Sequence, residues 1–116
     1  MHELQVTERI LNIVLKHAAG HDVSRIATIH LRIGELSDLE DEWMQRYFDY
    51  LSRDTLAEGA RLAIDRAPIV MGCDSCSHSF QVDKRELGTA TCPECGESRF
   101  HLVSGREYFV KNIEVV

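Results

Sequence analysis

The hydrophobic residues of two segments recur every three or four positions, which is the pattern of an amphipathic helix. Residues 4–19 form the first, with an apolar stripe that consists of Leu4, Leu11, Val14, Leu15 and Ala18. Residues 38–57 form the second, with an apolar stripe that consists of Trp43, Met44, Tyr47, Phe48 and Leu51. Gly20 is suited to end the first helix, and Ser37 or Asp38 is the expected N-cap of the second.

Three other segments have the character of strands. Residues 23–33 alternate, with Ile29 and Leu31 on one face and His30 on the other. Residues 61–67 and 107–116 are also rich in strand-forming side chains. A last strand needs a sheet to join, and we expect it to pair with the two earlier ones.

Residues 70–103 differ from the rest because they combine few aliphatic side chains with turn-forming glycine and proline. Such a segment buries too little apolar surface to fold without a staple. The predicted fold is therefore α+β: a small sheet packed with two helices, plus an inserted zinc-ribbon-like module. The expected domains are residues 1–69 with 104–116, which form a discontinuous α+β domain, and residues 70–103, which form the module.

Composition and charge narrow the function. The 116 residues are 44% hydrophobic, and 19 acidic against 13 basic side chains give a net charge of −6. A general nucleic-acid binder needs a cationic surface, so this class is disfavoured. No apolar stretch approaches the ~20 residues that span a bilayer. The start of the chain has no apolar run of a secretory signal, so a cytoplasmic location without membrane or nucleic-acid partners is expected.

All four cysteines lie in the 70–103 segment, as Cys73-x2-Cys76 and Cys92-x2-Cys95 separated by fifteen residues. Each pair can form a knuckle that directs two sulfurs at one point, and two knuckles supply the four soft ligands of a structural zinc site. Four thiolates leave no open position for a water, which disfavours a hydrolytic zinc enzyme. Loss of any one cysteine is expected to unfold the segment, because metal binding there is folding free energy.

Alternatives to this zinc site were weighed. Two disulfides are rare in a reducing compartment, and a redox dithiol needs its cysteine pair at a helix start. Nearby, His78 and His101 are expected to be exposed polar residues; the sharper hypothesis is a role as a second-layer donor or an alternative ligand. His17 and His21 are expected to be exposed or to interact with the end of the first helix.

The first three residues can form a different kind of metal site. The amine of Met1, the amide nitrogen of His2 and the His2 imidazole can close adjacent chelate rings around one ion. The amide nitrogen of Glu3 could complete a planar set, with its carboxylate nearby. Planar nitrogen ligands suit Ni(II) or Cu(II) rather than tetrahedral zinc. By itself this short motif is weak, because a frayed terminus looks the same.

The N-terminal Met1-His2-Glu3-Leu4, the compact α+β body and the two C-x2-C pairs together resemble the HypA/HybF family of nickel metallochaperones. This resemblance implies that Met1, His2 and Glu3 bind Ni(II), and that the zinc ligands are Cys73, Cys76, Cys92 and Cys95. It implies a carrier rather than an enzyme, one that serves the maturation of [NiFe]-hydrogenase and, in some organisms, urease.

The resemblance also implies partners: the nickel-insertion GTPase HypB, the hydrogenase large-subunit precursor and, where urease is served, urease accessory proteins. Whether the chain is a monomer or a homodimer is left open. The alternative function is a zinc-ribbon module that binds nucleic acid or takes part in transcription. Five acidic and three basic side chains in residues 70–103 argue against that alternative.

Overall fold

A computed structural model describes residues 2–116 of the chain, which divide into two compact units. The first unit consists of residues up to Arg32, Asp38–Asp65 and Phe109–Val116. The second consists of Ile33–Ser37 and Arg66–Tyr108. Each unit has its own three-stranded sheet.

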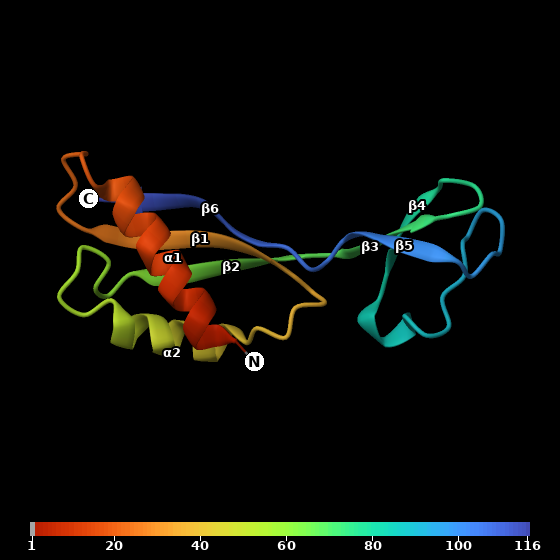
Figure 1. Ribbon diagram of the computed structural model, residues 1–116, viewed down its shortest axis with the longest axis horizontal. Coiled ribbons are helices and arrows are strands. Elements are labelled where there is room, and N and C mark those ends of the chain that lie inside the picture. The colour runs from red at the N-terminus through yellow and green to blue at the C-terminus, as the bar shows by residue number, and fades with distance from the viewer. Residues whose placement is uncertain (1) are drawn as a thin grey trace. The chain divides into compact units, whose positions relative to one another are not determined.

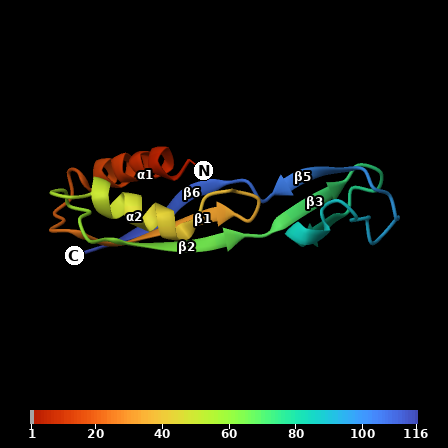
Figure 2. The ribbon, with the colours of Figure 1, turned by 90° about the horizontal axis from the view of Figure 1, so that it is seen from below.

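The first unit has two helices and a sheet in which β1 is the central strand, in the order β2-β1-β6. Its elements are α1 (Glu3–Ala18), β1 (Ile26–Gly34), α2 (Asp41–Leu51), β2 (Arg61–Ala67) and β6 (Tyr108–Val115). Both helices lie on the same face of the sheet (Figures 1 and 2). The expected pairing of the last strand with the earlier strands is confirmed, and so is the α+β class.

Helix α1 begins one residue earlier than expected, and its buried face is shifted. Its buried residues are Glu3, Val6, Thr7, Ile10, Leu11, Val14 and Ala18. The prediction was wrong for Leu4, which is 45% exposed, and Leu15 is only partly buried. The hydrophobic pattern of this helix is compatible with two neighbouring stripes, and packing against α2 and the sheet selects the one that contains the buried Glu3.

Helix α2 is shorter than the predicted 38–57 segment. It begins at Asp41, with Glu40 rather than Ser37 or Asp38 as its N-cap. It ends at Leu51 because the chain then forms turns: the hydroxyl of Thr55 donates to the Ser52 carbonyl (2.6 Å), a local bond that competes with helix.

The core of the first unit lies between the helices and the sheet. From the strands it receives Ile26, Ile29 and Leu31, and from α2 it receives Met44 and Phe48, all at most 1% exposed. Trp43 and Tyr47 were expected in this core. Instead Trp43 is 45% exposed and Tyr47 is partly buried, since a single turn of α2 can direct only part of its circumference at the sheet.

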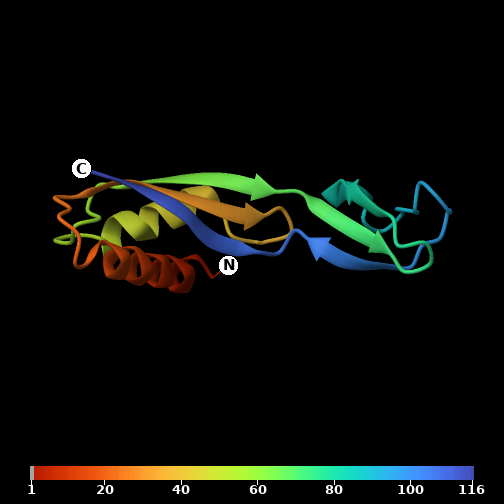
Figure 3. The same cartoon turned by 90° about the horizontal axis from the view of Figure 1, so that it is seen from above.

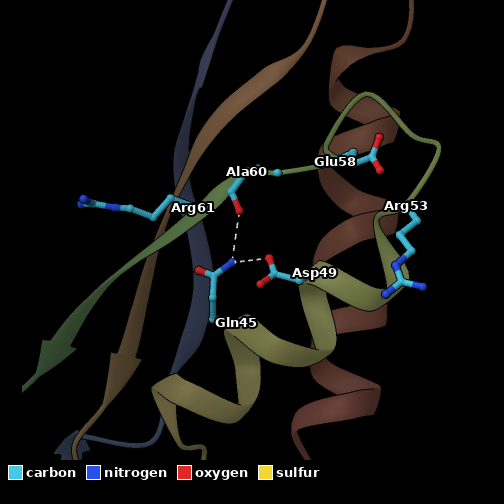
Figure 4. Close-up of a pocket in the computed structure, with 7 residues that line it drawn as sticks. Gln45, Asp49, Arg53, Glu58, Ala60 and Arg61 are labelled. Carbon is cyan, nitrogen blue, oxygen red and sulfur yellow. Dashed lines mark hydrogen bonds between the residues drawn. The ribbon is translucent and has the colours of Figure 1, made fainter.

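The outer edge of β2 is covered by the Gln45 side chain of α2 (Figure 4). The Gln45 amide oxygen accepts from the backbone N–H of Leu62 (2.8 Å). Its amide nitrogen donates to the carbonyl of Ala60 (3.2 Å) and to Asp49 (2.8 Å). The side chain thus takes the backbone groups that a further strand would need.

The second unit contains the cysteine segment, and its sheet was not predicted from the sequence. The order is β4-β3-β5, with both pairs antiparallel. Its elements are β3 (Ile69–Cys73), β4 (Ser79–Val82), the short 3-10 helix η1 (Lys84–Glu86) and β5 (Phe100–Ser104), as seen in Figure 3. Phe80 and Phe100 pack edge to face at 5.1 Å, which gives this small unit an aromatic contact.

Within the described residues, no helix is both long enough and apolar enough to cross a membrane.

Candidate metal centre

The four cysteines meet at one point of the second unit. Their sulfurs all lie within 4.8 Å of one another. Two of the separations are 3.5 Å, between Cys73 and Cys95 and between Cys76 and Cys92. Zinc–sulfur bonds of about 2.3 Å in a tetrahedron place sulfurs about 3.8 Å apart. The cluster therefore fits a structural zinc ion, and none of the four is in a disulfide.

The two cysteine pairs form knuckles with the same backbone bonding. In the first, the N–H of Cys73 donates to the carbonyl of His78 (2.9 Å), and the N–H of Ser77 donates to the carbonyl of Cys73 (3.0 Å). In the second, the corresponding bonds run from Cys92 to the carbonyl of Glu97 (2.8 Å) and from Gly96 to the carbonyl of Cys92 (2.8 Å). In each knuckle the residue after the second cysteine has positive φ. This shared local geometry directs both sulfur pairs inward.

The thiols of the metal-free cluster cannot all ionise together. The backbone N–H of Cys76, helped by that of Ser75, lowers the pKa of Cys73 to about 7. At Cys95 the backbone N–H of Glu97 favours the thiolate, but desolvation and the neighbouring sulfurs outweigh it and raise the pKa to about 12. Crowded thiolates repel one another, and a divalent cation removes that repulsion. The cluster is thus a site that needs a metal to become fully ionised.

A histidine and an aspartate brace the first knuckle from outside. The ring nitrogen Nδ1 of His101 lies 2.8 Å from a carboxylate oxygen of Asp74, in the Cys73–Cys76 turn. His101 is opposite Gly72 in the β3–β5 ladder. A Cβ at Gly72 would lie 2.5 Å from the imidazole, so only glycine leaves room for the ring. The alternation pattern of this segment gave no signal for this pair, because it depends on the pairing of two strands.

The second histidine beside the cluster has a different environment. The ring of His78 stacks on that of Phe80, with centroids 6.4 Å apart and planes 9° apart. Its carbonyl oxygen is the acceptor for the N–H of Cys73. His78 is partly buried, whereas His101 is exposed and lies in a strand rather than in a loop. Within the described residues, the four cysteines form the group of three or more side chains that could hold a metal.

The expected nickel tip lies at the start of α1. Met1 is outside the described residues. His2 is the N-cap of α1 and is exposed. Its carbonyl accepts from the N–H of Val6 (3.0 Å). Glu3 is the first residue of the helix and is only 6% exposed. The structure therefore places His2 and Glu3 next to each other in very different surroundings.

The burial of Glu3 was not expected from the sequence. Its carboxylate accepts a hydrogen bond from the backbone N–H of Glu40, at 2.9 Å. Glu40 is the N-cap of α2, so the carboxylate lies at the positive end of that helix. No local signal could reveal this contact, because 37 residues separate the two positions.

The remaining histidines of the first unit are away from this tip. His17 and His21 line a shallow apolar depression of about 320 Å³ with Ile113 and Val115. His30, predicted on the open face of its strand, is partly exposed and lies 2.6 Å from the carboxylate of Glu114 in β6.

Residues 1–115 match the HypA family, described as metallochaperones of hydrogenase and urease nickel incorporation. A hydrogenase maturation factor HypA from Alkalilimnicola ehrlichii is 37% identical, with 99% of each chain covered. One from Dehalococcoides mccartyi is 35% identical over 99% of this chain and 94% of its own.

Two solved structures have the same fold. The Ni metallochaperone HypA from Helicobacter pylori has a TM-score of 0.68 at 22% identity, with 100% of this chain and 98% of that chain covered. A second HypA solution structure has a TM-score of 0.75 at 23% identity, with 100% and 97% covered. With the family match over nearly the whole length and a cysteine cluster that fits zinc, the chain belongs to the HypA family of nickel metallochaperones for hydrogenase maturation.

Proposed function

We propose that this chain carries Ni(II) at its amino terminus, with Met1, His2 and Glu3 as the nickel site. The observation that supports the site is the position of His2. It is exposed at the first turn of α1, where backbone amides point away from the helix. An ion can reach this imidazole from solvent without any opening of the protein.

The start of a helix makes amide nitrogens available as ligands. The N–H groups of His2 and Glu3 precede the first residue that can bond to a carbonyl four positions earlier. Their deprotonation and coordination therefore break no helical hydrogen bond. The carbonyl of His2 is already used by Val6, and a nickel site made from nitrogens leaves that bond intact. The amine of Met1 and the imidazole of His2 would supply the other nitrogens.

An exposed site with few ligands suits transfer rather than storage. Ligands that solvent can reach are open to displacement by the ligands of an acceptor, one at a time. Protons compete with nickel for the imidazole and the amine, so acidification favours release. These properties describe a carrier, and a catalytic role is not needed to explain them.

The zinc site is proposed to have a separate, structural role. Cys73, Cys76, Cys92 and Cys95 are its ligands, and they fill the coordination sphere of a tetrahedral ion. Residues 70–103 would form the zinc-binding module, and residues 1–69 with 104–116 the nickel-binding domain. Zinc would supply the stability that the few buried aliphatic side chains of the module cannot.

The proposed partners are the GTPase HypB and the precursor of the hydrogenase large subunit, in the cytoplasm. Relatives described for both hydrogenase and urease support a nickel enzyme under assembly as the acceptor. Urease accessory proteins are partners where that enzyme is served.

The test is metal binding by tag-free protein that begins at Met1. We expect one tightly bound zinc and one exchangeable nickel per chain. His2→Ala is expected to abolish nickel binding in calorimetry while zinc content and the circular dichroism spectrum stay unchanged. His21→Ala is the matched control, because His21 is exposed in the same unit.

A second arm adds one residue before Met1, which moves the free amine and should weaken nickel binding. Nickel affinity that survives both changes would refute the proposed site. Zinc alone, together with co-purified nucleic acid, would favour the zinc-ribbon alternative instead.

A further inference from the structure

The carboxylate of Glu3 joins the starts of two helices. It belongs to the first turn of α1, and one of its oxygens accepts the backbone N–H of Glu40, at the first turn of α2 (2.9 Å). Figure 1 shows these two helix starts side by side. The Glu3 residue is 6% exposed, so this bond is shielded from water.

A carboxylate in such a place is there for a structural reason. Burial of a charged group is costly unless hydrogen bonds and an opposite charge compensate it. The start of α2 supplies both, through its free N–H groups and the positive end of its dipole. No side chain of α2 itself caps this helix, since Glu40 makes no side-chain capping bond. Glu3 therefore acts as the cap from outside.

The same residue is also held through its backbone. The hydroxyl of Thr7, which is fully buried, donates to the carbonyl of Glu3 (2.7 Å). The side chain of Glu3 is thus fixed to α2 and its carbonyl to the next turn of α1. The peptide that joins His2 to Glu3 can move little while both bonds persist. This is the peptide whose nitrogen is proposed to bind nickel.

We propose that Glu3 is a positioning residue whose carboxylate holds the His2–Glu3 peptide against the start of α2 and does not bind nickel itself. The inference rests on the proposed nickel site and adds a division of labour within it. The backbone nitrogen of Glu3 faces the ion, and the side chain fixes the backbone. A carboxylate engaged by Glu40 would have to give up that bond and its burial to become a ligand.

The experiment compares Glu3→Ala and Glu3→Gln in tag-free, zinc-loaded, full-length protein. Glutamine keeps an oxygen that can accept from the N–H of Glu40, whereas alanine has none. We expect the nickel Kd to rise about tenfold in the alanine variant and to stay within about threefold in the glutamine variant, as for other groups that orient metal ligands. Glu8→Ala, at an exposed position of the same helix, is the matched control.

Two spectroscopic readouts separate positioning from ligation. The visible absorption band of bound Ni(II) reports its ligand set and should be the same in wild type and Glu3→Gln. The fluorescence of Trp43, the single tryptophan and a residue of the first turn of α2, reports the start of that helix. Its emission should change in metal-free Glu3→Ala and not in Glu3→Gln or Glu8→Ala.

Two outcomes would overturn the inference. Equal loss of affinity in both variants, with a shifted nickel band in Glu3→Gln, would make the carboxylate a ligand. Wild-type affinity in Glu3→Ala would leave the carboxylate without a role. If Glu3→Ala does not fold, the band and affinity of Glu3→Gln still decide between ligation and positioning. Absence of nickel binding in the wild-type protein would instead refute the proposed function.

Discussion

Ser77 and Gly96 occupy the same place in the two cysteine knuckles. Each follows the second cysteine of its pair, with φ of 64° and 77° respectively. Each donates its N–H to the carbonyl of the first cysteine of its pair, at 3.0 and 2.8 Å. One knuckle thus uses a glycine for a left-handed backbone and the other uses a serine, for which this conformation is strained.

This difference predicts opposite effects of two substitutions. Gly96→Ala should destabilise the zinc-bound protein by about 1–2 kcal/mol, the cost of a left-handed L-residue. No heavy atom lies within 4 Å of the added Cβ, so the effect is one of backbone strain alone. Ser77→Gly should stabilise it by about 0.5–1 kcal/mol, because relief of strain exceeds the added chain entropy. Urea unfolding in excess zinc measures both, and two changes of the same sign would contradict the equivalence of the knuckles.

Zinc binding should release fewer protons as the pH rises through about 7. The pKa of Cys73 is lowered to about 7 by the backbone N–H groups of Cys76 and Ser75. Below this pH zinc must displace the proton of that thiol, and above it the thiolate is already present. Zinc affinity should therefore rise with pH, and about one proton fewer should be released at pH ~8 than at pH ~6.

The measurement is calorimetric titration of metal-free protein with zinc, in pairs of buffers with different ionisation enthalpies. A proton count that stays constant across this pH range would show that Cys73 ionises only with its neighbours. Removal of zinc by a chelator should follow the same order, with faster loss at the lower pH.

Gln45 should stabilise the first unit and keep the edge of β2 closed. Gln45→Met retains the size of the side chain but loses the bonds to Leu62 and Ala60. We expect a loss of about 1–2 kcal/mol in the free energy of unfolding, together with more self-association through the open edge. Gln5→Met, at an exposed position of α1, is the matched control for the gain of a methionine.

Urea denaturation and analytical ultracentrifugation test the two parts separately. Unchanged stability and unchanged sedimentation in Gln45→Met, relative to Gln5→Met, would show that solvent replaces the amide at no cost.

Local patterns were sufficient for the elements whose residues interact over short distances. The limits of β2 agree with the predicted 61–67, because alternation and the proline after it both act locally. The cysteine knuckles were also predictable, since C-x2-C needs only one turn to bring two sulfurs together. Helix α2 was predicted too long, because the polar turn after Leu51 competes with helix in a way that periodicity does not reveal.

Burial was less predictable than secondary structure. Leu4 and Trp43 fit an apolar stripe and are nevertheless exposed, each at 45%. Glu3 is charged and nevertheless buried. A helical pattern gives the direction of an apolar face only to within about one position, and the neighbouring elements decide which side of that stripe is covered. The second sheet was missed because its short strands have too few alternating residues to stand out.

The sequence by itself determined the four zinc ligands, the His2 tip, the two helices and the strands of the first unit, because each depends on spacing within a few residues. Only the tertiary structure decided that the Glu3 carboxylate caps α2 through Glu40, that Asp74 meets His101 and that Gln45 covers β2. These contacts join residues between 17 and 37 positions apart. Their partners are brought together by the packing of the helices and by strand pairing, which no local pattern encodes.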